Sequence, residues 1–230
     1  MTIDKNKAPR QYARLWRIVV RRYRVCLERP GFVVSAIGSI VALCASLGIT
    51  AFAIRYSTES ASNSVTDVIL SNTPVFNVGY PFVYGLFFFI VCVAYICLTN
   101  PKRMPFMLYS LALFVGIRAV FVSMTHIGPF VPHLESNFGP TITALFFGGD
   151  QFFSGHAGAP FLLALMYWHE KKIRYIFLSW SVFFSVVVLL GHLHYTIDVA
   201  SAFFMAFGIY HIALYLLPEE KRLFEAAVPV

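Results

Sequence analysis

Six apolar stretches, separated by short polar or basic segments, constrain the fold of this chain more than any other feature. A helix needs about 20 mainly apolar residues to cross a bilayer, and 58% of this chain is hydrophobic while 13% is charged. The pattern predicts an all-α integral membrane bundle of six transmembrane helices. The fourth stretch is short and contains Pro160, so its ends are the hardest to place, and a tilted helix fits it. The stretches cover roughly residues 31–56, 80–98, 104–125, 153–168, 174–192 and 196–217.

The cationic residues are unevenly distributed and predict the orientation of the bundle. Nine of them lie within residues 1–29. The positive-inside rule makes the face that carries them cytoplasmic, with both termini inside. The net charge of +7 therefore indicates a multi-pass orientation and not a nucleic-acid partner, and a bacterial inner membrane suits so short a chain. Seven further cations fall on the same predicted face, namely Lys102, Arg103, Lys171, Lys172, Arg174, Lys221 and Arg222.

The first 30 residues form a separate basic segment. Its arginines recur at helical intervals, which predicts a basic amphipathic helix lying on anionic cytoplasmic lipid and ended by Pro30-Gly31. A cationic stop that only fixes the orientation is an equally good interpretation. We expect the six-helix domain to occupy residues 31–220 and a cytoplasmic tail to occupy residues 221–230. The periodic arginines are Arg14, Arg17, Arg21 and Arg24.

His194 and Asp198 stand four residues apart at the predicted start of the sixth stretch. On a helix this spacing brings the two side chains onto one face. The carboxylate can then hold the imidazole in one tautomer and raise its basicity. Taken alone, the motif also fits a structural His–Asp pair. Its place at the outer interface, beside a second histidine motif, favours acid–base or nucleophilic chemistry.

The second motif is Ser154-Gly155-His156, near the start of the fourth stretch. A helix N-terminus offers free backbone N–H groups and the positive end of the helix dipole, which suit an anionic oxygen such as that of a phosphate. Glycine would allow a ligand to approach the backbone closely. Because both motifs open helices on the same predicted side, we expect them to form one site.

Arg118 is a cation within the third stretch, about two helical turns below the predicted outer surface. An ionisable residue at such a depth needs an anion or an internal carboxylate. We expect it to bind a phosphate, and a structural ion pair is the alternative.

Other polar residues on the outer side are weaker candidates. Asp150 could orient the 149–156 turn, cap a helix or neutralise a cationic headgroup. Glu135 and Tyr195 are further candidates for substrate binding, although Glu135, like Asp67, also fits an ordinary solvated loop acid. His192 could join His194 in a metal-binding pair, but we expect neither a metal nor a cofactor.

These motifs together resemble a known family. The Ser-Gly-His and His-Tyr-Thr-x-Asp motifs are similar to those of the sphingomyelin synthase-related branch of the type 2 phosphatidic acid phosphatase (PAP2-like) superfamily. The likeness extends to Gly149-Asp150, to the segment from Arg118 to Pro129, and to six spans with both ends cytoplasmic. The superfamily's Ser-Arg dipeptide is absent, because Val187-Val188 occupy those places, and Arg118 could replace it.

The resemblance implies a catalytic set of His156, His194 and Asp198 at the outer or lumenal side of the membrane. His194, oriented by Asp198, would attack phosphorus and form a phosphohistidine. His156 would protonate the departing lipid alkoxide and then deprotonate the incoming hydroxyl. Ser154, Gly155 and Arg118 would contact the substrate.

The implied partners are a phospholipid donor and a lipid alcohol acceptor, and a homo-oligomer is left open. A hydrolase that uses water as acceptor at the same site is the main alternative. A transporter or channel would need polar residues along several spans, whereas the second and sixth stretches are almost wholly apolar.

Overall fold

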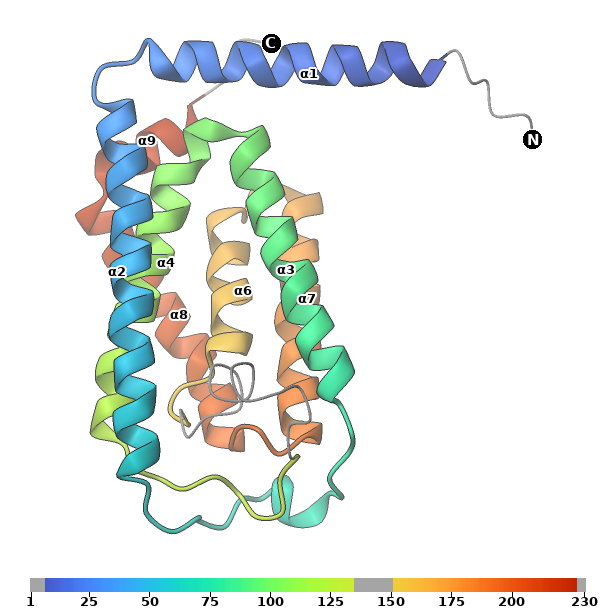
Figure 1. Ribbon diagram of the computed structural model, residues 1–230, viewed down its shortest axis with the longest axis vertical. Helices are drawn as coiled ribbons and strands as arrows, with labels where there is room; N and C mark the ends of the chain where they lie inside the picture. Colours follow the sequence, from blue (N-terminus) through green and yellow to red (C-terminus); the bar gives the residue numbers. More distant parts are fainter. Residues whose placement is uncertain (1–6, 135–150, 227–230) are drawn as a thin grey trace.

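The computed structural model of the protein describes residues 7–134 and 151–226, which form a helical bundle without a β-strand in either range. Five helices are long and apolar enough to cross a membrane. The connections at one end of the bundle are short, while two longer loops, residues 60–78 and 125–134, lie at the other (Figure 1). The five helices are α2 (Phe32–Glu59), α3 (Gly79–Thr99), α4 (Met104–Met124), α7 (Lys171–Leu190) and α8 (Thr196–Leu216).

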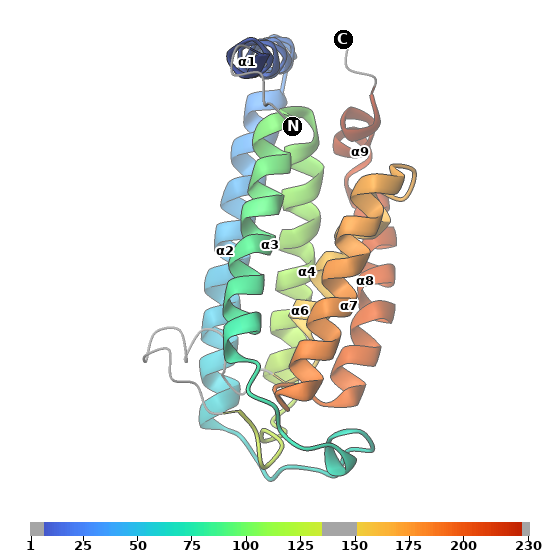
Figure 2. The ribbon, with the colours of Figure 1, turned by 90° about the vertical axis from the view of Figure 1, so that its right-hand side faces the viewer.

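The first helix, α1 (Lys7–Leu27), lies across one end of the bundle instead of continuing α2 (Figure 1). The corner falls at Gly31, whose φ of 79° is in the left-handed region that glycine adopts most easily. The last helix, α9 (Pro218–Glu225), lies at the same end in both views (Figures 1 and 2). The predicted tail from residue 221 is therefore helical as far as residue 225.

Most of the basic residues lie at this end, which we call the cation-rich end. It comprises α1, the short helix η2 (Pro101–Arg103), the turn between α6 and α7, and α9. Arg103 forms an ion pair with Glu170, and its guanidinium lies 5.0 Å from the centre of the Tyr167 ring. Phe224 of α9 packs edge-on against Tyr167, with 5.1 Å between the ring centres. Aromatic packing and paired charge thus join α9 to the bundle.

The helix at the centre of the bundle is α6 (Gly155–Met166), and it is shorter than predicted. The sequence predicted a span over residues 153–168, but twelve helical residues rise only about 18 Å, against about 30 Å for the hydrocarbon core of a bilayer. Eight of its twelve residues are buried, and Leu162, Leu163 and Ala164 are fully so. A sixth span therefore does not follow from α6, which is instead enclosed by its neighbours α4, α7 and α8 (Figure 2).

Close approach between α6 and its neighbours depends on small residues. A Cβ atom on Gly158 would lie 2.7 Å from the ring of Phe114 in α4 and 3.3 Å from the carbonyl oxygen of Ala202 in α8. On the α7 side, the Ser181 hydroxyl donates a hydrogen bond to the Ala157 carbonyl at 2.8 Å. These contacts fix the position of the first turn of α6, which carries one of the predicted motifs.

Candidate active site

Two histidines from separate segments of the chain meet at the end of the bundle opposite the cation-rich end. His156 lies in the first turn of α6, and His194 lies two residues before α8. Their ring centres are 5.9 Å apart. His194 is buried and His156 half-buried. We call this region, where α6 and α8 begin, the histidine end.

The orientation of His194 depends on a backbone carbonyl that no sequence pattern could single out. Its Nδ1 lies 3.0 Å from the carbonyl oxygen of Gln151 and 3.5 Å from Oδ2 of Asp198. A carbonyl oxygen can only accept a hydrogen bond, so Nδ1 carries the proton in this arrangement. Nε2 then keeps its lone pair and can act as a base or a nucleophile. The carboxylate contributes to the orientation from a slightly longer distance.

Asp198 also organises the backbone at the start of α8. Its Oδ2 accepts a hydrogen bond from the backbone N–H of Tyr195 at 2.9 Å, so the carboxylate satisfies a donor at the helix N-terminus. Its own carbonyl oxygen accepts from the N–H of Ser154 at 3.0 Å. Because Ser154 immediately precedes α6, this second bond ties the start of one histidine-bearing segment to the start of the other.

His156 lies against an aromatic wall. Its ring centre is 4.7 Å from that of Phe82 in α3 and 6.0 Å from that of Phe184 in α7. Both phenylalanines are fully buried. An imidazole in such surroundings is partly shielded from water, which strengthens its electrostatic interaction with a bound anion.

Arg118 of α4, the predicted phosphate ligand, lies directly beside the Ser-Gly-His turn. Its Nε donates a hydrogen bond to the carbonyl of Phe153 at 2.7 Å, and only 6% of the residue is exposed. A Cβ atom on Gly155 would lie 3.2 Å from this Nε, so the glycine makes room for the guanidinium. A fixed positive charge at the N-terminus of α6 forms an environment suited to an anion.

Two predicted substrate-binding residues have internal hydrogen bonds. The hydroxyl of Ser154 caps α6 by accepting from the N–H of Ala157 at 3.4 Å. The hydroxyl of Tyr195 donates to the carbonyl of Gly128 at 2.8 Å and accepts from the N–H of Val65 at 3.2 Å. Tyr195 thus joins both loops of the histidine end to the start of α8. The two other predicted residues, Glu135 and Asp150, lie outside the described residues.

Asp67 has a larger part in the site than its position in a polar loop indicated. Its two carboxylate oxygens accept from the hydroxyl of Thr196 at 2.6 Å and from the N–H of Thr196 at 2.7 Å. The same carboxylate accepts from the N–H groups of Ile69 and Leu70, at 2.9 and 3.0 Å. Asp67 therefore holds the 60–78 loop against the first residue of α8.

These hydrogen bonds also affect the ionisation of Asp67. Burial by itself would raise the pKa of its carboxyl group, but the bonds from Thr196, Leu70 and Ile69 outweigh that effect and hold the pKa below the usual 3.8. Asp67 is thus ionised at neutral pH, and its negative charge stabilises the positive end of the α8 dipole. No local sequence signal pointed to this role, because Thr196 is 129 residues further along the chain.

His192 contacts the loops at the histidine end, which indicates a structural role. Its Nδ1 lies 2.9 Å from the carbonyl oxygen of Pro132, its Nε2 lies 3.4 Å from the Thr73 hydroxyl, and its ring packs edge-on against Phe130. Both ring nitrogens therefore have partners in the loops that cover the histidine end. Among the described residues, no group of three or more histidine, cysteine or acidic side chains is placed to hold a metal ion.

Comparison with known proteins supports a family for the C-terminal part of the chain. Residues 148–215 match the family model described as PAP2 superfamily C-terminal. No curated protein and no solved structure matches the chain. The matched region contains Ser154, His156, His194 and Asp198, and the match supports a PAP2-like membrane protein. Members of this superfamily are generally phosphatases or phosphotransferases, so the match supports an enzyme.

Proposed function

We propose that this protein is an integral membrane phosphotransferase that moves a phospho-headgroup from a glycerophospholipid to a lipid alcohol. The observation that carries the proposal is the separation of 5.9 Å between the His156 and His194 rings. Two imidazoles from separate segments of the chain at this distance can act on substituents of one phosphorus atom. Their place in the matched PAP2-like region supports the same chemistry.

In the first half-reaction, Nε2 of His194 attacks the phosphorus of the donor. An N–P bond forms while the P–O bond to the glycerol lipid breaks, and protonated His156 gives its proton to the departing alkoxide. The Nδ1 proton stays on the ring, held by the Gln151 carbonyl and stabilised by Asp198. This arrangement stabilises the positive charge that develops on the imidazole as it attacks.

In the second half-reaction, neutral His156 removes the proton from the acceptor hydroxyl. The acceptor oxygen forms a new P–O bond, the N–P bond breaks, and His194 returns to its starting state. Arg118 and the first N–H groups of α6 stabilise the charge on the non-bridging phosphate oxygens in both steps. A sphingomyelin synthase-like reaction is the specific form of transfer that the two motifs suggest.

The aromatic wall around His156 favours a lipid alcohol over water as acceptor. Phe82 and Phe184 make this side of the site apolar, which suits a hydroxyl attached to a hydrocarbon chain and limits water at the phosphohistidine. The alternative is a lipid phosphatase or phospholipase C-type hydrolase with water as acceptor. The PAP2 match accommodates that alternative, because the superfamily includes phosphatases.

We also propose an orientation in the membrane. The positive-inside rule puts the cation-rich end in the cytoplasm. Because α1 and α9 lie at this end, both termini would be cytoplasmic, and the histidine end would face the periplasmic or lumenal side. The donor and the acceptor would then come from the outer leaflet.

The test is a transfer assay with purified protein in vesicles that contain headgroup-labelled phospholipid, with and without candidate lipid alcohols. We expect labelled lipid product only when an alcohol is present. Label that appears in water-soluble form, independent of any alcohol, would overturn transfer in favour of hydrolysis. No labelled product of either kind, with every headgroup and alcohol class tried, would overturn both. Mass spectrometry of lipids from cells with and without the protein would identify the donor and the acceptor together.

A further inference from the structure

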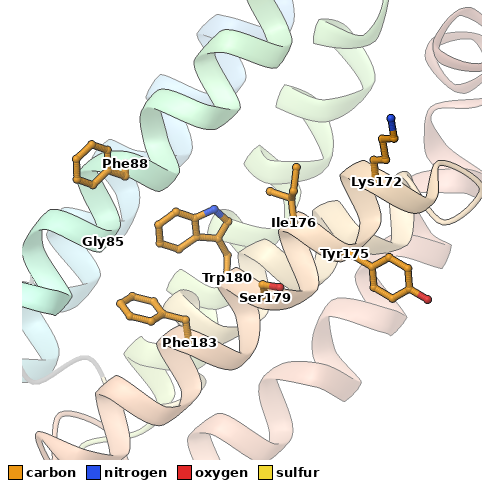
Figure 3. Close-up of a pocket in the computed structure, with 8 residues that line it drawn as sticks. All are labelled: Gly85, Phe88, Lys172, Tyr175, Ile176, Ser179, Trp180 and Phe183. Atoms are coloured by element: carbon orange, nitrogen blue, oxygen red, sulfur yellow. The ribbon is translucent and has the colours of Figure 1, made fainter. Parts of the chain in front are cut away.

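A groove lies between α3 and α7 (Figure 3), and neither His156 nor His194 lines it. Its volume is about 660 Å³. Phe88 of α3 and Trp180 of α7 line its middle, while Lys172 lies at one end and Phe183 at the other. The groove therefore has one charged end and otherwise mainly apolar walls.

The groove is separated from the candidate active site by aromatic side chains. A Cβ atom on Gly85 would lie 2.7 Å from the ring of Phe183, so the two helices meet closely at this point. Phe82 lies about one turn from Gly85 toward the histidine end, and Phe184 directly follows Phe183; both rings pack on the His156 ring. A molecule in the groove would thus have aromatic rings between itself and His156.

The length of the groove fits one leaflet of a bilayer. Lys172 and Phe183 are eleven residues apart on α7, which corresponds to a rise of about 17 Å. Half of the hydrocarbon core of a bilayer is about 15 Å thick. Lys172 is the second residue of α7, so the charged end of the groove lies at the cation-rich end of the bundle. This is the level at which we expect lipid headgroups.

The charge of Lys172 is available to a ligand. Nearby, Glu170 forms its ion pair with Arg103, and Arg174 donates to the carbonyl of Trp168 at 3.0 Å. Within residues 7–134 and 151–226, no carboxylate forms an ion pair with Lys172. Its ammonium group is exposed and complementary to an anion.

We propose that this groove binds one anionic phospholipid from the leaflet at the cation-rich end. The phosphate lies at Lys172, and one acyl chain follows the groove past Trp180 and Phe88 to the close contact at Gly85. This lipid is bound and not turned over, because the aromatic rings separate it from His156. It would hold α3 against α7, whose direct contact is limited.

The test uses Trp180 as a reporter inside the groove. The chain has three tryptophans, and replacing Trp16 and Trp168 by phenylalanine leaves Trp180 as the only one. This variant is placed in vesicles of phosphatidylcholine mixed with brominated phosphatidylglycerol, whose acyl bromines quench nearby tryptophan. The reverse mixture, with brominated phosphatidylcholine, gives the relative binding constant of the anionic over the zwitterionic lipid.

We expect a preference of about fivefold for the anionic lipid, which Lys172→Gln reduces to about one. Lys171→Gln is the matched control, because Lys171 is the neighbouring cation but does not line the groove, and it should keep most of the preference. Equal loss in both lysine variants would show diffuse surface charge and overturn the proposal. Equal binding of the two lipids by the parent variant would also overturn it.

A filled groove gives a second test. Ser179 lines the groove and is exposed, so Ser179→Phe should occupy the space of the acyl chain and reduce the quenching of Trp180 by both lipids. Unchanged quenching would contradict binding in the groove. His194→Ala should keep the lipid preference, so the result is independent of the proposed reaction. Circular dichroism and gel filtration of each variant check that it is folded.

Discussion

Arg103 and Arg118 lie near opposite ends of the bundle, and their surroundings differ in kind. Arg103 forms an ion pair with Glu170 and lies over the rings of Tyr167 and Phe224, at 5.0 and 5.2 Å from their centres. Arg118 donates to the carbonyl of Phe153 and lies against Gly155, beside the first turn of α6. The first environment neutralises the charge and uses it for packing.

The second environment keeps positive charge at a helix N-terminus. At the histidine end, polar groups orient one another: a carbonyl holds His194, Asp198 holds the backbone of Tyr195, and Asp67 holds Thr196. Ordering and desolvating so many polar groups costs free energy. A function therefore explains this arrangement better than a contribution to stability does. Arginine thus stabilises the fold at one end of the bundle and prepares a candidate anion site at the other.

The largest expected effect is at the histidines. His194→Ala removes the proposed nucleophile and His156→Ala the proposed acid and base, so each should lower transfer at least about 1,000-fold. His133→Ala is the control, because this exposed loop histidine lies within hydrogen-bonding distance of the Phe130 carbonyl and is not part of the histidine pair, and it should be active. Initial rates with labelled phospholipid measure the effect. Near-normal turnover by folded His194→Ala protein would contradict the proposed phosphohistidine intermediate.

The same substitution should have different effects on turnover at the two arginines. Arg118→Leu should lower kcat about 100-fold, because it removes a fixed donor for charge that develops on the phosphate. Arg118→Lys keeps the charge without the planar group and should recover part of the rate. The matched change at the other end, Arg103→Leu, should leave kcat within about twofold. Similar losses of kcat in Arg103→Leu and Arg118→Leu would contradict the distinction between the ends.

Replacing Asp67 should have an intermediate effect on activity, because this residue positions the start of α8. Asp67→Asn weakens the hold on Thr196, and we expect about a tenfold lower kcat and a loss of about 1 kcal/mol in stability. Because the folded pKa of Asp67 is below the usual 3.8, its stabilisation is complete above that pH and is lost as the pH falls through the folded pKa. Thermal unfolding should therefore show a difference between wild type and Asp67→Asn that disappears in strong acid. A difference that is constant with pH would argue against the charge.

The smallest effect is expected for the ion pair at the cation-rich end. Glu170→Gln should lower the free energy of unfolding by about 0.5 kcal/mol, since 41% of this glutamate side chain is exposed and solvent screens the pair. Turnover should not change. A double-mutant cycle with Arg103→Gln measures the coupling. A large loss of activity in Glu170→Gln would mean that the two ends of the bundle are energetically coupled, which would contradict their different roles.

The helical membrane class, the distribution of cations and the two histidine motifs could all be predicted from the amino-acid sequence. Long apolar runs and the number of cations in each segment are local properties, so they can be recognised without knowledge of tertiary contacts. The motifs were also local: Ser154-Gly155-His156 does open α6, and Asp198 does lie in the first turn of α8.

How these parts meet depends on the packing of the folded chain. The length of α6 could not be derived, because an apolar run does not reveal whether it crosses the membrane or is enclosed by other helices. The carbonyl of Gln151 could not be singled out either, since every residue carries one. Asp67 holds a threonine 129 residues away, and such a bond is set by the folded path of the chain, for which a single sequence has no local signal.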